Sequence, residues 1–168
     1  MPNTKTLILN NEQIYQKINR ISYQIFEDNH TEKEIIVVGI AKNGYLFATK
    51  LADQLGEISK AKITLAKLTI DKENPITTKG KMDISPELLS DKVVILVDDV
   101  LNSGKALIYG VKYLLDFPIK KMSTTVLVDR NHKKYPIGTH YVGLSLSTTL
   151  QNHISVEFSG SKISAFLS

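Results

Sequence analysis

Residues 93–107 read VVILVDDVLNSGKAL and constrain the fold more than any other stretch of the chain. Seven apolar residues, interrupted only by the paired carboxylates Asp98 and Asp99, lead into a turn of small residues. After this turn, apolar residues recur at helical spacing at Leu107, Val111, Leu114 and Leu115. The stretch therefore predicts a buried strand that ends in two acids, then a tight turn and an amphipathic helix.

The turn at 102–106 has the chemistry of a phosphate site. Amides in the first turn of a helix lack intrahelical partners, so the amides of residues 103–106 would be free to donate to a phosphate dianion. Gly104 permits close backbone approach and Lys105 adds charge. The two carboxylates would accept hydrogen bonds from sugar hydroxyls, so we predict a site for a ribose 5-phosphate. The alternative is that the acids merely end a buried strand and that the turn is an ordinary connection.

The rest of the chain alternates strands with helices. Asn10 and Gln13 have the spacing of a capping box, and a helix is predicted after them from the apolar residues Ile14, Ile18, Ile21, Ile25 and Phe26. Further elements are predicted as buried strands at 34–40, 63–70, 93–97 and 123–128, a helix at about 45–55 that Gly56 closes, and a helix that Pro118 closes. Short strands follow at 141–146 and 154–158, in a hood or at an edge of the sheet. This order predicts an α/β fold, with a doubly wound and mostly parallel sheet.

Length and composition set further limits. With 168 residues the chain is close to the usual size of one domain, so we expect residues 1–168 to form a single domain. The absence of cysteine excludes disulfides, thiolate catalysis and cysteine-ligated zinc. A net charge of +4 suits an anionic ligand but is too small to establish nucleic-acid binding. No apolar run reaches membrane-spanning length, so a cytoplasmic protein with no membrane partner is expected.

At residues 93–105 the chain resembles the type I phosphoribosyltransferases. The family motif is a hydrophobic strand, two acidic residues and a Thr/Ser-Gly loop for the 5-phosphate of phosphoribosyl pyrophosphate. The resemblance implies a small hood over the sheet, a flexible flap, and displacement of pyrophosphate from C1 of the ribose by a nucleobase, with Mg²⁺ as the cofactor that holds the pyrophosphate. Asp98 and Asp99 would be catalytic, because a carboxylate stabilises an oxocarbenium-like transition state. The implied ribose-phosphate residues are Asp98, Asp99, Asn102, Ser103, Gly104, Lys105 and Ala106.

Two further segments gain a meaning from this resemblance. Residues 71–91 hold two prolines, lysines alternating with acids, and no apolar periodicity, which predicts a flexible loop at the place of the flap. Its candidates to reach the pyrophosphate are Lys72, Lys79 and Lys81. The alternative is a solvated insertion without ligand contact.

Backbone amides at the turn after strand 34–40 would bind the pyrophosphate, and this turn consists of Ala41, Lys42, Asn43 and Gly44. The alternative there is a plain strand-to-helix turn.

Residues 126–143 are similar to one branch of the family, the bifunctional pyrimidine operon attenuation regulators and uracil phosphoribosyltransferases. The resemblance implies that the base-binding residues are Val128, Asp129, Arg130 and His132. The chain departs from relatives at Asn43 (arginine), Ala106 (threonine), Asn131 (glycine) and Leu144 (lysine). Arg130, His132, Lys133 and Lys134 form a basic cluster that is either a solvated turn or, in a dimer, a surface for RNA.

Three functions remain open from the sequence. The first is a phosphoribosyltransferase that joins a nucleobase, with uracil favoured, to ribose 5-phosphate. The second is a non-catalytic, nucleotide-sensing, RNA-binding regulator of pyrimidine genes, which the departures at Asn43, Ala106 and Leu144 suggest. The third is a purine phosphoribosyltransferase. We expect a homodimer or a higher homo-oligomer in each case. The isolated His30, His140 and His153 lack metal-ligand spacing, so structural roles are expected for them.

Overall fold

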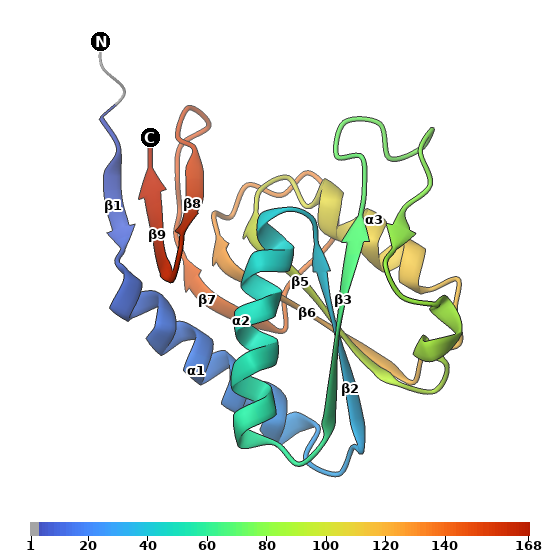
Figure 1. The fold of residues 1–168 in the computed structure, drawn as a ribbon. Helices are drawn as coiled ribbons and strands as arrows, with labels where there is room; N and C mark the ends of the chain where they lie inside the picture. Colours follow the sequence, from blue (N-terminus) through green and yellow to red (C-terminus); the bar gives the residue numbers. More distant parts are fainter. Residues whose placement is uncertain (1–3) are drawn as a thin grey trace.

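The computed structural model describes residues 4–168 and has an α/β architecture, as the sequence predicts (Figure 1). Within these residues a six-stranded sheet has the order β4-β3-β2-β5-β6-β7. Its members are β2 (Glu34–Ile40), β3 (Lys62–Thr69), β4 (Lys81–Met82), β5 (Val93–Leu101), β6 (Lys121–Asp129) and β7 (Tyr141–Ser145). All neighbours pair in parallel except β3 and β4. The sheet is therefore mostly parallel, with an antiparallel edge strand.

Helices cover both faces of this sheet. The helices α1 (Asn11–Asp28) and α2 (Asn43–Ile58) pack on one face, against β-strand residues such as Ile35 and Ile95. The helix α3 (Lys105–Leu114) and the short 3₁₀ helix η1 (Pro86–Leu89) pack on the other face, against residues such as Ile36 and Leu96. The central strands are buried on both sides, which explains why β2 and β5 read as continuous apolar runs.

A second, three-stranded sheet of order β1-β9-β8 forms the hood. It consists of β1 (Thr6–Leu9), β8 (Ile154–Ser159) and β9 (Lys162–Leu167), all antiparallel. Figure 1 shows it beside the carboxyl ends of the central strands, across from the loop that joins β3 to β4. Strand 141–146 thus becomes the edge β7 of the main sheet, and strand 154–158 becomes the hood strand β8. The sequence patterns did not predict β1 or β9.

Three predicted boundaries were wrong. Helix α2 does not end at Gly56 but continues to Ile58, and the Ser59 amide still bonds to the Leu55 carbonyl at 2.9 Å. Helix α3 ends at Leu114, and tighter turns follow it up to Pro118, in which the Asp116 and Phe117 amides donate to the carbonyls three residues before them. Strand β5 does not end at the two acids but runs through them to Leu101, since Val100 and Leu101 still pair with β6.

The 71–91 segment is not uniformly without structure. Its second half contains β4 and η1, whose Met82 and Leu89 are buried against the sheet. The loop that lacks helix and strand covers residues 70–80.

Among the helices of residues 4–168, none has both the length and the apolar character needed to cross a bilayer.

Candidate active site

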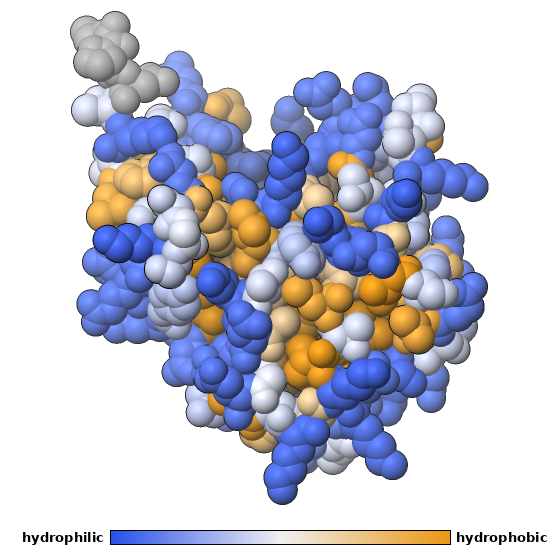
Figure 2. All heavy atoms as spheres, viewed as in Figure 1, coloured by the Kyte–Doolittle hydropathy of each residue, from blue (hydrophilic) through white to orange (hydrophobic). Residues whose placement is uncertain are grey.

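The candidate site lies where the chain reverses its direction of travel across the sheet. From β2 the chain moves outward to β3, whereas from β5 it moves the opposite way to β6 and β7, although β2 and β5 are neighbours. In open α/β sheets, ligands bind in the crevice outside the carboxyl ends of strands at such a switch point. The turn at 41–44 follows β2 and the turn at 102–104 follows β5, so both predicted loops meet there. Figure 2 shows the surface hollowed between the hood and the 70–80 loop.

The 102–106 turn is shaped for close contact with an anion. Gly104 is the N-cap of α3 and has φ 87°, in the left-handed region that glycine adopts without strain. A Cβ at this position would also lie 2.4 Å from a methyl group of Ile137. The Lys105 amide, predicted to be free, donates to Ser103 Oγ at 3.2 Å, so the serine side chain shapes the turn.

Six of the seven predicted ribose-phosphate residues line one cavity of about 150 Å³. They are Asp98, Asn102, Ser103, Gly104, Lys105 and Ala106. Lys72 also lines this cavity, and its ammonium lies 3.9 Å from Asp98 Oδ1. The Lys105 ammonium donates to the Glu73 carbonyl at 3.3 Å, so the first residues of the 70–80 loop contact the 102–106 turn. We call the 102–106 turn the phosphate turn, after the role predicted for it. Of the three lysines predicted to reach the pyrophosphate, Lys72 lines this cavity, whereas Lys79 and Lys81 are not among its lining residues. The sequence alone did not rank the three.

The two acids differ in their surroundings. Asp98 is 4% exposed and its Oδ1 accepts the Asp99 amide at 2.9 Å, whereas Asp99 is half-buried and is not among the cavity-lining residues. Burial raises the pKa of the Asp98 carboxyl well above its usual range, and the neighbouring Asp99 charge raises it further. Lys72 opposes this rise in the pKa. A cation delivered to the crevice would be attracted to this pair of carboxyl groups.

The 41–44 turn lies directly against Asp98. A Cβ on Gly44 would lie 2.8 Å from Asp98 Oδ1, so only glycine lets the start of α2 approach this closely. The Ala41–Lys42 peptide bond is cis, and the Lys42 side chain is exposed. Asn43, where the resemblance implies an arginine in relatives, donates from Nδ2 to the Val156 carbonyl of the hood strand β8 at 3.0 Å. This amide is therefore engaged with the hood.

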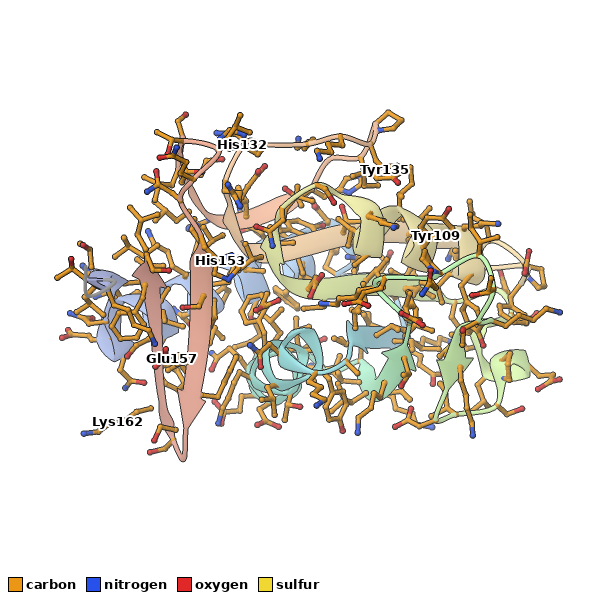
Figure 3. All side chains as sticks on the ribbon, turned by 90° about the horizontal axis from the view of Figure 1, so that it is seen from above. Tyr109, His132, Tyr135, His153, Glu157 and Lys162 are labelled. Atoms are coloured by element: carbon orange, nitrogen blue, oxygen red, sulfur yellow. The ribbon has the colours of Figure 1, made fainter. Side chains whose placement is uncertain are left out.

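The four base-site candidates lie at the end of β6. Val128 is in the core, and Asp129 is buried with Oδ1 accepting the Asn131 amide at 2.9 Å. Asn131, where the resemblance implies a glycine in relatives, has φ 57°, a conformation open to both glycine and asparagine. Arg130 and His132 contact the β7–β8 connection. Figure 3 shows His132 and Tyr135 on the chain between β6 and β7, with Tyr135 near Tyr109 of α3.

The histidines without predicted site roles make local contacts. His30 Nδ1 bonds to the Glu27 carbonyl at 2.9 Å, and His140 Nδ1 accepts the Thr124 amide at 3.2 Å. Residues 4–168 contain no cluster of three or more metal-ligating side chains. The donor set at the crevice, two neighbouring carboxyl groups, fits a magnesium ion that takes its remaining oxygen ligands from water and substrate phosphates.

The comparisons with known proteins agree with this geometry. The model of the phosphoribosyl transferase domain matches residues 5–159. The chain belongs to the phosphoribosyltransferase family. The bifunctional protein PyrR of Clostridium acetobutylicum is 33% identical to this phosphoribosyltransferase over 165 residues, which cover 94% of this chain and 93% of the relative. The bifunctional protein PyrR of Haemophilus ducreyi is 32% identical, covering 89% of this chain and 88% of the relative.

Solved structures of phosphoribosyltransferases share the fold. A hypoxanthine-guanine phosphoribosyltransferase from Bacillus anthracis aligns with a TM-score of 0.72 and 25% identity, covering 85% of this chain and 84% of that one. The hypoxanthine phosphoribosyltransferase of Trypanosoma cruzi aligns with a TM-score of 0.77 and 14% identity, covering 95% of each chain. The second likeness concerns the fold alone.

Proposed function

We propose that this phosphoribosyltransferase joins uracil to ribose 5-phosphate, taken from phosphoribosyl pyrophosphate, and releases pyrophosphate. The observation that carries the proposal is the convergence of three groups at one switch-point crevice: the 102–106 turn, the carboxyl group of Asp98, and the 41–44 turn. Phosphoribosyl pyrophosphate consists of a phosphate, a ribose and a pyrophosphate joined in that order, so its three parts correspond to these three groups of the protein. Uracil is favoured because residues 126–143 resemble the pyrimidine branch of the family.

Each group has a role in this reaction. The 5-phosphate binds at the amino end of α3, where the helix dipole and the backbone amides favour negative charge. Asp98 and Asp99 bind the ribose hydroxyls and stabilise positive charge as the bond at C1 breaks. The start of α2 and the ammonium of Lys72 receive the pyrophosphate. Asp98 and Asp99 would hold a magnesium ion, which would supply positive charge to the pyrophosphate leaving group.

A second candidate is the non-catalytic regulator that binds a nucleotide and RNA. The Asn43 side chain favours this candidate. Its amide donates to the Val156 carbonyl in the hood, so it is not free to bind a pyrophosphate. The basic residues 130–134 would then bind RNA phosphates, and this affinity would fall steeply with salt. A purine phosphoribosyltransferase is the third candidate, since a hypoxanthine-guanine enzyme is 25% identical.

The deciding experiment measures pyrophosphate release from phosphoribosyl pyrophosphate and Mg²⁺ with one base at a time. Uracil, hypoxanthine, guanine, xanthine and adenine are offered in turn, and the Asp99→Asn variant is the control for contaminating activity. Release with uracil alone is the expected result. Release with a purine alone would reassign the substrate. Binding of phosphoribosyl pyrophosphate without release for any base would support the regulator.

We also propose that the protein forms a homodimer or a higher homo-oligomer. Figure 2 shows apolar side chains over β3, beside α2. On these elements Leu46 is 41% exposed, and Ile63 and Leu65 are only partly buried. An apolar surface of this kind is typical of an interface between subunits. Sedimentation equilibrium should give a mass of at least twice 18.8 kDa, and a monomer mass at micromolar concentration would contradict the proposal.

A further inference from the structure

Arg130 connects two segments that lie on either side of it. Its Nη1 donates to Asn102 Oδ1 in the phosphate turn at 3.3 Å. Its Nε donates to Thr148 Oγ1 and its Nη2 to the Thr149 carbonyl, both at 3.2 Å, in the β7–β8 connection. Three of the five N–H groups of the guanidinium therefore bond to protein atoms. A planar fork that is fixed at three points holds its partners in one relative position.

The chain around Arg130 reinforces both contacts. On one side, the amides of Lys134 and Tyr135 donate to the Ser103 carbonyl at 2.8 and 3.1 Å, so residues 130–135 support the phosphate turn from behind. On the other side, His132 Nε2 donates to the Thr148 carbonyl. Thr149 and Asn152 close a local turn with each other. Arg130 and His132 thus supply hydrogen bonds that join Thr148 and Thr149 to the chain that follows β6.

We infer that Arg130 is a positioning residue that couples the phosphate turn to the β7–β8 connection, residues 146–153. Binding of the 5-phosphate orders Asn102, and the guanidinium transmits that order to Thr148 and Thr149. The site that binds ribose phosphate thereby sets the position of the segment that borders the base-site candidates. This inference rests on the proposed function, because it takes the 102–106 turn to be the 5-phosphate site. Coupling of two sites requires an element that contacts both, and the guanidinium is such an element.

Amide hydrogen exchange with ribose 5-phosphate as the probe tests the coupling without any need for turnover. In the wild type, ribose 5-phosphate should slow exchange at residues 103–106 and also at residues 147–150. In Arg130→Lys and Arg130→Gln, exchange at 147–150 of the free protein should be about tenfold faster, as loss of one charge-assisted hydrogen bond predicts, and should no longer respond to the probe. Lys112→Gln, on the exposed face of α3, controls for the loss of one positive charge nearby.

The lysine variant separates positioning from direct binding. A lone ammonium keeps the charge but cannot bridge three acceptors, so Arg130→Lys should be as impaired as Arg130→Gln. If Arg130→Lys retains the response of residues 147–150 to ribose 5-phosphate, the inference is wrong. If the wild type protects 103–106 but not 147–150, the inference is also wrong while the proposed function stands. If ribose 5-phosphate protects neither segment, the proposed function fails, and the inference fails with it.

Discussion

Asp98 lies in the interior of this phosphoribosyltransferase, beside the carboxyl group of Asp99, with its nearest cation, Lys72, at 3.9 Å on a half-exposed side chain. A buried acid of this kind is destabilising when it is ionised, because burial removes water from the charge and the half-exposed Lys72 offsets only part of that cost. The same carboxyl group lines the cavity beside the phosphate turn, where a positively charged transition state or a metal ion would supply the missing charge. Stability and function therefore make opposite demands on this residue.

Asp98→Asn should be more stable than the wild type at neutral pH and much less active. The folded-state pKa is raised above the unfolded value, so the folded protein binds more protons than the unfolded one between the two pKa values. Stability of the wild type then falls as pH rises from about 4 towards the folded-state pKa, and the asparagine variant lacks this fall. Urea unfolding at pH 5, 6, 7 and 8 measures it. If the difference in free energy of unfolding between Asp98→Asn and the wild type does not grow with pH, ionisation of Asp98 does not destabilise the protein.

Ala106→Thr and Asp99→Asn should change the kinetics in opposite directions. Ala106 lines the cavity, and a hydroxyl there would add one neutral hydrogen bond to the phosphate, which lowers the KM for phosphoribosyl pyrophosphate about fivefold. Asp99→Asn removes the charge that we propose stabilises the transition state, so kcat should fall about 100-fold. Steady-state kinetics on both variants separate binding from catalysis. A near-wild-type kcat for Asp99→Asn would remove Asp99 from the catalytic assignment.

Among the elements, a hydrogen bond from Asn43 joins α2 to the hood. Asn43→Ala removes the bond to the Val156 carbonyl and should lower the free energy of unfolding by about 1 kcal/mol. It should also speed amide exchange in β8 and raise the KM for phosphoribosyl pyrophosphate. Gln54→Ala is the matched control, because it also removes a side-chain amide of α2. The hydrogen bond lost there, from Gln54 Nε2 to Asn19 Oδ1 of α1 at 3.0 Å, lies away from the crevice. Equal KM values for the two variants would show that the hood contact has no role in binding.

The sequence predicted those elements whose burial is visible as a local pattern. Strands β2, β5 and β6 are buried on both faces, and α1 has an apolar stripe with the Asn10 and Gln13 capping box in place at 2.9 Å. The order of these elements sufficed for the α/β class and for the position of the 102–106 turn between β5 and α3. Boundaries were less predictable, because Gly56 is open to solvent and does not stop α2 when Ile58 still packs on the core.

The hood and the flap contacts were not predictable in the same way. Strands β1 and β9 pair across most of the chain, Thr6 with Leu167, and a single short sequence window holds no signal for such a pairing. The same holds for Asn43 with Val156 and for Lys72 with Asp98, which come together only once β2, β5 and the hood are assembled. The one signal within reach of the sequence was Asn43 itself, as a departure from the family pattern at a loop position.

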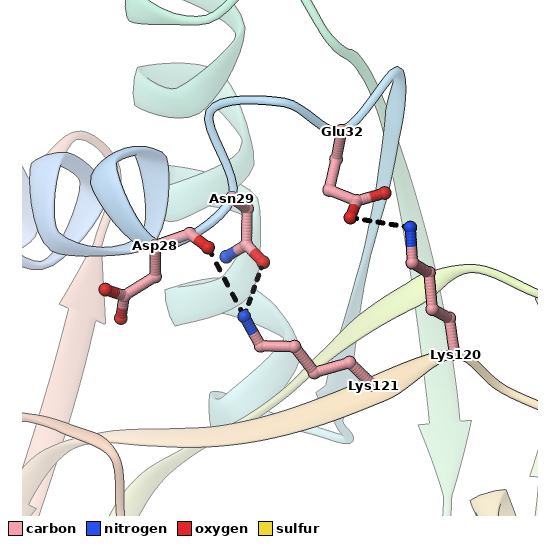
Figure 4. A network of polar contacts seen from close by, with 5 residues as sticks. All are labelled: Asp28, Asn29, Glu32, Lys120 and Lys121. Atoms are coloured by element: carbon pink, nitrogen blue, oxygen red, sulfur yellow. Dashed lines mark hydrogen bonds and ion pairs between the residues drawn. The ribbon is translucent and has the colours of Figure 1, made fainter.

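At the scale of the whole molecule, the two ends of the main sheet have different tasks. The carboxyl ends of the strands carry the crevice, whereas the amino ends are fastened by polar contacts. Figure 4 shows Lys121, at the start of β6, donating to Asn29 Oδ1 at 2.9 Å and to the Asp28 carbonyl at 3.3 Å, with Lys120 paired to Glu32 at 2.9 Å nearby. Tyr141 of β7 also donates to Asp28 Oδ2 at 2.5 Å. These contacts tie the end of α1 to the sheet.

Lys121→Met should therefore weaken the fold without changing the site. Methionine keeps the apolar part of the side chain but loses both hydrogen bonds, so the free energy of unfolding should fall by about 1 kcal/mol. Because Lys121 and Asp129 stand at opposite ends of β6, about 26 Å apart at 3.3 Å per residue, the KM for phosphoribosyl pyrophosphate should stay at the wild-type value. Urea unfolding and steady-state kinetics on the same preparation test both parts. A raised KM together with lost stability would mean that strain at the amino ends of the strands reaches the crevice, and that the sheet does not separate the two tasks.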